Sequence, residues 1–405
     1  MMTDSYIPQV SGLVTSIVLF RKELERLGHE IFIIAPVGPD DDPRCMKVKG
    51  LRFLTEKQHK IAIPNLKSIH QFLQDNKVTH LHSHAPFSMG FAAMQLQKKY
   101  GYVHIHTYHT LLVEYRHYIP KPFTPSRQTI SEFSRWFCNQ MDGVFAPTTE
   151  IQDELAQYGV HKRIWVIPTG IDTYAFEGVA TLSLKQSFGL PEDAVVGLYA
   201  GRLGVEKNVE FLIRTTESIV RRGFPFYLII VGDGPNRKPL EEMVQEKGLA
   251  HRIRFTGYMN RKQLIEYYKA ADLFLFASTT ETQGLVVLEA MAAGTPVVAI
   301  AQKGVKNVLL QGQGCLLIPR PDEQSFRQNV ELLIQDEQVR RYLSGLGKDY
   351  VQQFWSMEKS AKQAENVYGE LERDPNYVPQ KIFTMSRFIT AISRKLSDIE
   401  KSLFE

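Results

Sequence analysis

The sequence predicts an α/β protein with two tandem, doubly wound domains of the Rossmann type. Short apolar runs of strand length alternate with helical segments, which is typical of βαβ units in a parallel sheet. This alternating series occurs twice, and a looser segment between Pro168 and Pro191 separates the two copies. A chain of 405 residues is also too long for a single hydrophobic core. We therefore expect a cleft between the carboxyl ends of the two sheets, where such folds bind ligands.

The first domain is expected over residues 1–170, and its opening loop leads into a helix that ends at Gly28. The pattern predicts strands at 29–35, 78–83, 102–107, 143–147 and 164–167, and further helices at 90–100, 128–139 and 150–158. Only two residues precede the opening loop. We therefore expect Met1 and Met2 to be the last residues of a first strand whose beginning is missing from this chain.

The second domain is expected over residues 171–353, and a third segment over 354–405. Strands are predicted at 194–200, 226–231, 252–255, 272–277, 296–301 and 315–318. The third segment begins with a helix over 356–373. Apolar residues then follow a seven-residue repeat on one helix face, namely Met385, Ile389, Ile392, Leu396, Ile399 and Leu403. This tail could pack on the protein itself, form a homodimer contact, or lie on a membrane surface.

The composition excludes several classes of protein. The net charge of +4 is too small to indicate nucleic acid as a partner, although 11 of the 12 histidines lie in the first 170 residues. The three cysteines are far apart and lack metal-binding or redox spacing, which fits a reducing cytosol. No signal peptide is recognised, and no apolar run reaches the ~18 residues of a membrane-spanning helix. Any membrane association is therefore expected to be peripheral.

One stretch, residues 277–300, carries two carboxylates between two buried strands. The residues between the strands predict a helix over 285–293, which Gly294 ends because it can adopt a left-handed conformation. Glu281 lies in the loop at the carboxyl end of the first strand, and Glu289 lies near the middle of the helix. From this stretch alone, a solvated surface and a binding cleft are equally good interpretations.

Further polar residues follow other predicted strands. Gly12 lies in the opening loop, where a backbone without Cβ can approach a phosphate near a helix N-terminus. His109 follows the strand at 102–107, and Arg202 and Lys207 follow the strand at 194–200. Each is an ordinary residue alone. Together with the two carboxylates they suit a sugar joined to a diphosphate, because cations bind the phosphates and carboxylates bind sugar hydroxyls.

These residues belong to motifs that resemble the retaining glycosyltransferases of family GT4, which have the GT-B fold. The matching segments are TDSYIPQVSGLVTSI (3–17), HSHAPFSMG (82–90), TYHTLLVEYRHYI (107–119), VIPTGIDTYAF (166–176), GRLGVEKN (201–208), VGDGP (231–235), FTGY (255–258) and ETQGLVVLEAMAAGTPVVA (281–299). The resemblance spans roughly residues 3–372. Gln283 stands where many members of the family carry Phe. This ETQG version and the 107–119 segment are similar to the bacterial diacylglycerol glucosyltransferases.

The resemblance implies a role for each residue that matches a family motif. It places His109 beside the reacting sugar, Glu281 on the sugar hydroxyls, and Arg202 and Lys207 on the leaving diphosphate, so that these four are the catalytic residues. The implied donor-binding residues are Gly12, Arg202, Lys207, Gly257, Tyr258, Glu281, Gly284, Leu285 and Glu289. The helix over 356–373 would cross back onto the first domain. No metal or other cofactor is expected, and the polar loop at 40–42 is expected to be solvated.

The acceptor is expected to bind to the histidine-rich first domain. The residues proposed to bind it are Phe87, Tyr115, Tyr118 and His84. Lys57, Lys60 and Lys67 flank the apolar segment 61–63 and could meet anionic lipid. The alternative interpretation is that these aromatic side chains pack inside the domain.

The combined prediction is a metal-independent, retaining hexosyltransferase of the cytoplasm, bound peripherally to the inner face of the cell membrane. It would move a hexose, with glucose favoured, from a UDP-sugar to diacylglycerol or a glycosylated diacylglycerol. Three alternatives stay open: a soluble sugar or polysaccharide acceptor, a non-catalytic partner that binds nucleotide-sugar or glycan, and a dehydrogenase-type protein. The last is disfavoured because the 201–204 turn does not make the G-x-G-x-x-G fingerprint.

Overall fold

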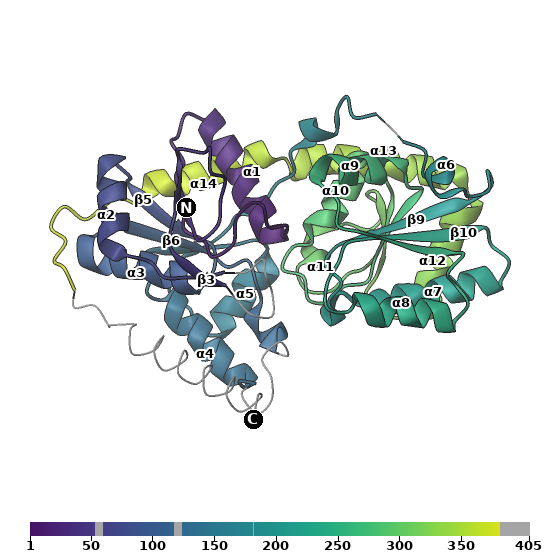
Figure 1. Cartoon of the computed structure of the whole chain (residues 1–405), viewed down its shortest axis with the longest axis horizontal. Helices are drawn as coiled ribbons and strands as arrows, with labels where there is room; N and C mark the ends of the chain where they lie inside the picture. Colours follow the sequence, from purple (N-terminus) through teal and green to yellow (C-terminus); the bar gives the residue numbers. More distant parts are fainter. Residues whose placement is uncertain (53–59, 117–123, 181, 381–405) are drawn as a thin grey trace.

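The computed structural model describes residues 1–52, 60–116, 124–180 and 182–380. It confirms the expected architecture of two α/β domains, each built on parallel strands covered by helices (Figure 1). Tyr118, Lys57 and the heptad-patterned tail lie outside the described residues. No described helix is long and apolar enough to cross a membrane.

The first half of the chain folds around the histidine-rich strands. Its elements are α1 (Gly12–Arg26), β1 (Ile33–Ala35), β2 (Cys45–Lys47), β3 (Gly50–Arg52), β4 (Lys60–Ala62), α2 (Leu66–Asp75), β5 (His80–Ser83), α3 (Ser88–Tyr100), β6 (Val103–Thr107), η1 (Leu112–Glu114), α4 (Arg127–Cys138), β7 (Gly143–Ala146), α5 (Thr149–Gln157) and β8 (Ile164–Val166). Strands β5, β6, β7 and β8 are parallel neighbours in that order, and β1 pairs with β2.

Met2 stands between these two groups of strands. It forms parallel bridges to both Ile34 of β1 and Ser83 of β5. Its N–H donates to the carbonyl of His82 at 2.7 Å, and its carbonyl accepts from the N–H of His84 at 3.2 Å. These are the contacts expected of a residue at the carboxyl end of a central strand. The opening loop therefore leaves the sheet beside the end of β5.

The second half is a six-stranded parallel sheet with helices on both faces (Figure 1). Its elements are η3 (Thr173–Phe176), α6 (Leu184–Phe188), β9 (Val195–Ala200), η4 (Val205–Lys207), α7 (Val209–Arg221), β10 (Phe226–Val231), α8 (Arg237–Glu246), β11 (Ile253–Gly257), α9 (Arg261–Ala270), β12 (Leu273–Phe276), α10 (Leu285–Ala293), β13 (Val297–Ile300), α11 (Val305–Val308), β14 (Cys315–Ile318), α12 (Glu323–Gln335) and α13 (Glu337–Phe354).

The strand order of the second sheet is β11-β10-β9-β12-β13-β14. Counted from the first strand of this sheet, the order is 3-2-1-4-5-6, which is the doubly wound order that binds nucleotides. The chain direction of the crossovers reverses between β9 and β12. The loops that follow these two strands must therefore open a crevice at the carboxyl edge of the sheet.

Helix α14 (Met357–Glu370) crosses back from the second domain and packs along α1 (Figure 1). Leu19, Phe20 and Leu24 of α1 share one core cluster with Ala361 and Ala364 of α14. The crossing is fastened by a backbone pair, since the N–H of Ile171 donates to the carbonyl of Trp355 and the N–H of Met357 donates back to Ile171. A Cβ on Gly170 would lie 2.4 Å from the Cα of Met357, so only glycine allows this approach.

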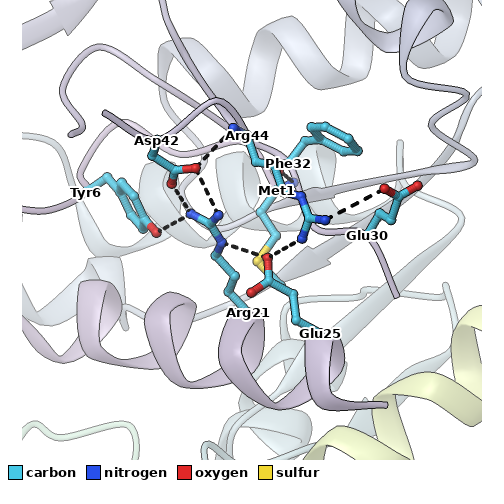
Figure 2. A network of polar contacts seen from close by, with 8 residues as sticks. All are labelled: Met1, Tyr6, Arg21, Glu25, Glu30, Phe32, Asp42 and Arg44. Carbon is cyan, nitrogen blue, oxygen red and sulfur yellow. Dashed lines mark hydrogen bonds and ion pairs between the residues drawn. The ribbon is translucent and has the colours of Figure 1, made fainter. Parts of the chain in front are cut away.

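Figure 2 shows a charged network that ties the opening loop to α1. Arg21 donates to the hydroxyl of Tyr6 at 3.2 Å and to both carboxylate oxygens of Asp42, and Glu25 joins Arg21 to Arg44. The hydrogen bond from Arg21 holds the pKa of Asp42 below its usual range. The expectation that this acidic loop is solvated is wrong for Asp42, because its carboxylate is only 18% exposed and is paired with Arg21.

Candidate functional site

The switch point of the second sheet brings together a cation and a carboxylate. Lys207 ends η4 after β9, and Glu281 lies in the loop after β12. The ammonium of Lys207 is 2.5 Å from a carboxylate oxygen of Glu281, and the two side chains are only 15% and 17% exposed. Burial is the largest single influence on the pKa of Lys207 and would lower it, but the charge and hydrogen bond of Glu281, together with Tyr115 and Tyr199, outweigh burial and raise the pKa. Lys207 is therefore a fixed positive charge in the crevice.

Two local features hold this pair in place. Asn208 adopts a left-handed conformation with φ of 54°, and its amide donates to the carbonyl of Ala277 at the end of β12. This bond joins the turn after β9 to the neighbouring strand. On the other side, the N–H of Gly304 donates to the carbonyl of Glu281 at 2.9 Å. A Cβ on Gly304 would lie 1.9 Å from the carbonyl oxygen of Thr282, so a side chain there would displace the loop that carries Glu281.

Three glycines allow backbone segments to approach closely at the same edge of the second sheet as the Lys207–Glu281 pair. Gly201, Gly232 and Gly257 follow or end the adjacent strands β9, β10 and β11. The N–H of Gly232 donates to the carbonyl of Gly257, and a Cβ on Gly232 would lie 1.9 Å from the carbonyl oxygen of Gly201. Arg202 is exposed directly after Gly201, and Tyr258 after Gly257 is 53% exposed. This edge therefore offers backbone, a cation and an aromatic ring to a ligand.

Glu289 is buried on α10 rather than solvated, with 4% of its surface exposed. Its carboxylate accepts from Arg261 at 2.6 Å and from the hydroxyl of Tyr268 at 3.2 Å, both on α9. Gly284, with φ of 82°, starts the helix, and Leu285 is its half-buried first residue. Sequence reasoning missed both partners of Glu289, because nothing in the spacing of α9 shows which of its residues face α10.

His109 follows β6 and faces the second domain. Its Nε2 shares a hydrogen bond of 3.0 Å with Nδ1 of His84, and the two rings stack. Burial lowers the pKa of His109 to about 4, so the ring is neutral at pH 7. Gly12 is the exposed first residue of α1, and Phe87 is 55% exposed at the start of α3. The structure thus places His84, Phe87 and His109 together at the carboxyl edge of the first sheet.

The loop that carries Glu281 docks on three successive strand ends of the first sheet. Thr282 donates its hydroxyl proton to the carbonyl of His109 at 2.8 Å, after β6. Its own carbonyl accepts from Thr148, after β7, at 3.1 Å. Gln283 is buried and forms two hydrogen bonds with the backbone of Thr169, after β8, at 2.9 and 2.6 Å. This loop, residues 281–284, therefore contacts the first domain at all three strand ends. The sequence marked Gln283 as unusual but did not predict these contacts.

Tyr115 lies on the first-domain side of the same crevice. Burial raises its pKa, and the charges of Lys207 and Glu281 both act on the phenol. An electrostatic influence of this kind requires proximity, so Tyr115 lies near the Lys207–Glu281 pair. Within the described residues, no three His, Cys, Asp or Glu side chains are grouped in a way that could hold a metal ion.

We predict that Gln283→Leu opens the contact between the domains. The variant leaves the N–H and carbonyl of Thr169 without partners, and each buried unpaired group costs about 1–3 kcal/mol. Separation of the domains lets water reach these groups and recovers part of that cost. Small-angle X-ray scattering should therefore report a larger radius of gyration than for the parent protein. Gln302→Leu, on an exposed loop of the same domain, is the control; equal radii for all three proteins would contradict the prediction.

Comparison with known proteins agrees with this geometry. Residues 10–174 match the family described as Glycosyltransferase Family 4, and residues 182–349 match Glycosyl transferases group 1. The chain is 31% identical to the alpha-monoglucosyldiacylglycerol synthase of Streptococcus pneumoniae over 316 residues, which cover 76% of this chain and 72% of that protein. It is 27% identical to the synthase of the same name from Acholeplasma laidlawii over 352 residues, which cover 82% and 88%.

A solved structure has the same fold. The sucrose-phosphate synthase of Thermosynechococcus elongatus superposes with a TM-score of 0.74 at 22% identity, over 89% of this chain and 94% of that one. The two-domain architecture, the switch-point residues and the relatives that match across most of both chains point to one family, and they exclude the dehydrogenase alternative. The chain belongs to glycosyltransferase family 4 and is a glycosyltransferase with the GT-B fold.

Proposed function

We propose that the chain moves a hexose, with glucose favoured, from a UDP-sugar to diacylglycerol or a glycosylated diacylglycerol, with retention and without a metal ion. The observation that carries the proposal is the Lys207–Glu281 pair, which lies at the switch point opposite His109 and Tyr115. The names of two relatives that match across most of their length support glucose and diacylglycerol as the substrates.

The donor would bind by exchanging partners with the ion pair. Its diphosphate takes the place of Glu281 beside the Lys207 ammonium, and Arg202 adds a second cation. The released carboxylate of Glu281 can then accept hydrogen bonds from hydroxyls of the sugar. These two cations oppose the charge that develops on the leaving diphosphate, which is electrostatic stabilisation of the transition state. In this arrangement side chains supply the positive charge that a metal ion provides in other transferases.

Glu289 would receive the ribose of the donor, and Gly257 and Tyr258 would lie near its base. Because Arg261 and Tyr268 already donate to Glu289, they hold its carboxylate in one orientation. The remaining acceptor capacity of that carboxylate is then available for a ribose hydroxyl. The N-terminus of α1 at Gly12 would face the diphosphate from the first domain, where free N–H groups favour an anion.

Retention would follow if the acceptor hydroxyl attacks from the side of the leaving diphosphate. The hydroxyl oxygen forms the new bond to the anomeric carbon, the bond from that carbon to the diphosphate oxygen breaks, and the diphosphate oxygen takes the hydroxyl proton. His109 would contact the sugar as a neutral ring, since its pKa of about 4 excludes a charged imidazole at pH 7. The product anomer, measured by NMR, tests this step, and an inverted product would refute it.

A lipid acceptor would approach over the first domain. Leu51, Ile63 and Phe87 are large apolar side chains of the first domain that are 62%, 51% and 55% exposed. Lys67, at the start of α2, is exposed near Ile63. Apolar side chains with a neighbouring cation suit the surface of an anionic membrane. Peripheral attachment to the inner face of the cell membrane is the arrangement that would bring diacylglycerol to this side of the crevice.

The deciding experiment supplies radiolabelled UDP-glucose and diacylglycerol in mixed anionic vesicles to the wild type and to Glu281→Ala. We expect a labelled glycolipid from the wild type and none from the variant. Transfer to a soluble sugar without vesicles would establish the rival acceptor within the family. UDP-glucose binding without any transfer would favour a non-catalytic partner, and absence of binding to any UDP-sugar would refute the donor assignment.

A further inference from the structure

A small pocket lies at the switch point of the first sheet, between the end of Met2 and the ends of β5 and β6. Its volume is ≈ 80 Å³, and its polar lining includes Asp4, Ser5, His84, His106 and His109. Since roughly 15 Å³ of such volume holds one water molecule, the pocket can accommodate a group of a few heavy atoms. The sequence and the proposed function give no role to Asp4 or His106.

A row of buried, hydrogen-bonded side chains leads to this pocket. Their partners determine which nitrogen of each histidine ring carries the proton. The amide nitrogen of Gln97 donates to Asp142 at 3.1 Å, which turns the amide oxygen of Gln97 toward Nδ1 of His104 at 3.3 Å. Burial lowers the pKa of His104 to about 3, so its ring is neutral and carries one proton. That proton must be on Nδ1, because an amide oxygen only accepts. Nε2 of His104 is therefore an acceptor, and the hydroxyl of Ser83 donates to it at 2.8 Å.

The same reasoning assigns His106. The single hydroxyl proton of Ser83 is used by His104, so the oxygen of Ser83 accepts from Nδ1 of His106 at 2.9 Å. Burial holds the pKa of His106 well below its usual value, and the neutral ring has no second proton. Its Nε2 is thus a bare acceptor. This nitrogen is buried, and among the described residues it has no hydrogen-bond partner.

Asp4 is a second acceptor on the lining of the pocket. Its carboxylate accepts from the hydroxyl of Ser88 and from the N–H of Met89 at 3.2 Å, and so caps α3, whose Phe87 has no capping side chain. This capping bond explains why α3 begins at Ser88, two residues before the predicted start. A carboxylate has about four acceptor positions, so Asp4 keeps capacity for a ligand.

His84 completes the polar wall. Its Nδ1 is shared with His109, while its Nε2 is buried and, within the described part of the chain, lacks a partner. His84 and His106 both line this small pocket, and each has a buried nitrogen that is left unsatisfied. Because unpaired buried polar groups are rare and costly, such a site calls for a bound polar group. A bare imidazole nitrogen is an acceptor, so its partner must be a group that donates a hydrogen bond.

We propose that this pocket binds a hydroxymethyl group of a substrate, with Nε2 of His106 accepting its hydroxyl proton and Asp4 accepting from a neighbouring hydroxyl or ordered water. The inference rests on the proposed function, because it presumes that the substrates are alcohols. Two sources share this chemistry: the free alcohol of the glyceride acceptor and the hydroxymethyl group of the donor hexose. Both would place the group beside His109.

Steady-state kinetics of two variants distinguish the sources. His106→Asn keeps an amide donor for Ser83 but removes Nε2, and Asp4→Asn keeps a side chain that can cap α3. If the group belongs to the acceptor, we expect KM for dioleoylglycerol to rise about tenfold, as for one lost hydrogen bond of ~1.4 kcal/mol, with KM for UDP-glucose unchanged. If it belongs to the donor, KM for UDP-glucose rises instead, and the variant no longer discriminates against a 6-deoxy donor. Unchanged values for both substrates would overturn the proposal.

Two further measurements separate this proposal from the proposed function. His161→Asn alters an exposed histidine of the same domain that does not line the pocket, and should leave both KM values unchanged. Titration of the ¹⁵N-labelled protein with glycerol and with methyl glucoside, without donor, should shift the Nε2 resonance of His106. A shift in a protein that transfers no sugar would support the pocket while the proposed function fails. Absence of a shift with both probes would overturn the pocket.

Discussion

Replacement of Lys207 by methionine is expected to lower kcat/KM for glycosyl transfer about 10²–10³-fold, the loss typical of one removed group that stabilises transition-state charge. The methionine side chain fills much of the same volume but cannot oppose the charge on the leaving diphosphate. The effect should be mainly in kcat, because the charge is largest in the transition state. Initial rates over a range of donor concentrations give both constants. Lys238→Met, on the exposed face of α8, should retain full activity.

The same variant should also be less stable, because it leaves Glu281 as an uncompensated, largely buried carboxylate. Removing one partner of a buried ion pair costs about 3 kcal/mol. The double variant Lys207→Met with Glu281→Gln should regain most of this stability and none of the activity. Denaturant unfolding monitored by circular dichroism measures the free energy of unfolding of the parent, the two single variants and the double variant. If the single variant is as stable as the parent, the pair does not contribute as proposed.

Acidification from pH 7 to 5 is expected to destabilise the first domain. Burial lowers the pKa of His70 and, more strongly, the pKa of five further histidines, namely His82, His84, His104, His106 and His109. Below pH 6.5 the unfolded chain binds protons at these histidines, while the folded chain does not until about pH 4 for His109 and about pH 3 for His104. Because the unfolded state binds more protons in this window, stability falls as the pH falls.

Two carboxyls act in the opposite direction. Burial raises the pKa of Asp4 to about 6 and also raises that of Asp142, so the folded state binds their protons first. The unfolded state still binds more protons, because the groups with a lowered pKa outnumber these two carboxyls and include the amino terminus of Met1, whose pKa burial lowers to about 5. Each excess proton corresponds to about 1.4 kcal/mol per pH unit. A typical stability of ~5–15 kcal/mol would then be consumed within a few pH units. Thermal unfolding between pH 7 and 5 measures the slope. His104→Gln should make it shallower and the exposed His161→Gln should not; a melting temperature independent of pH would contradict the expectation.

Most of the sheet framework could be predicted from the sequence, because strands buried on both faces of a parallel sheet read as continuous apolar runs. The helix over 285–293 and its end at Gly294 were predicted with the correct bounds. The strand expected over 29–35 is shorter, since only Ile33–Ala35 pairs with β2. Strands β2, β3 and β4 were not predicted, because segments of three residues are too short to show an apolar run. Helix α2 was also missed, although Ile69 and Leu73 lie on one apolar face of its ten residues.

The candidate site, too, could be predicted only in part. Lys207 and Glu281 could be placed near each other from sequence, because both follow strands of one doubly wound sheet and its strand order is restricted. Contacts between the two domains, and between helices that pack on each other, could not be predicted. The hydrogen bonds of Gln283 with Thr169 depend on how the two domains face each other, and Arg261 reaches Glu289 only through the packing of α9 on α10. Periodicity says which face of an element is buried and not what covers it.

The place of α14 has a consequence for how the chain folds during its synthesis. Helix α1 is made first, yet the apolar face formed by Leu19, Phe20 and Leu24 is covered by a helix near the other end of the described chain. Ribosomes add ~5–20 residues per second, so the whole second domain takes roughly ten to forty seconds to make. During that interval the nascent first domain exposes an uncovered apolar stripe. A chaperone that binds nascent chains would meet that stripe first, and truncation before residue 357 would leave it permanently uncovered.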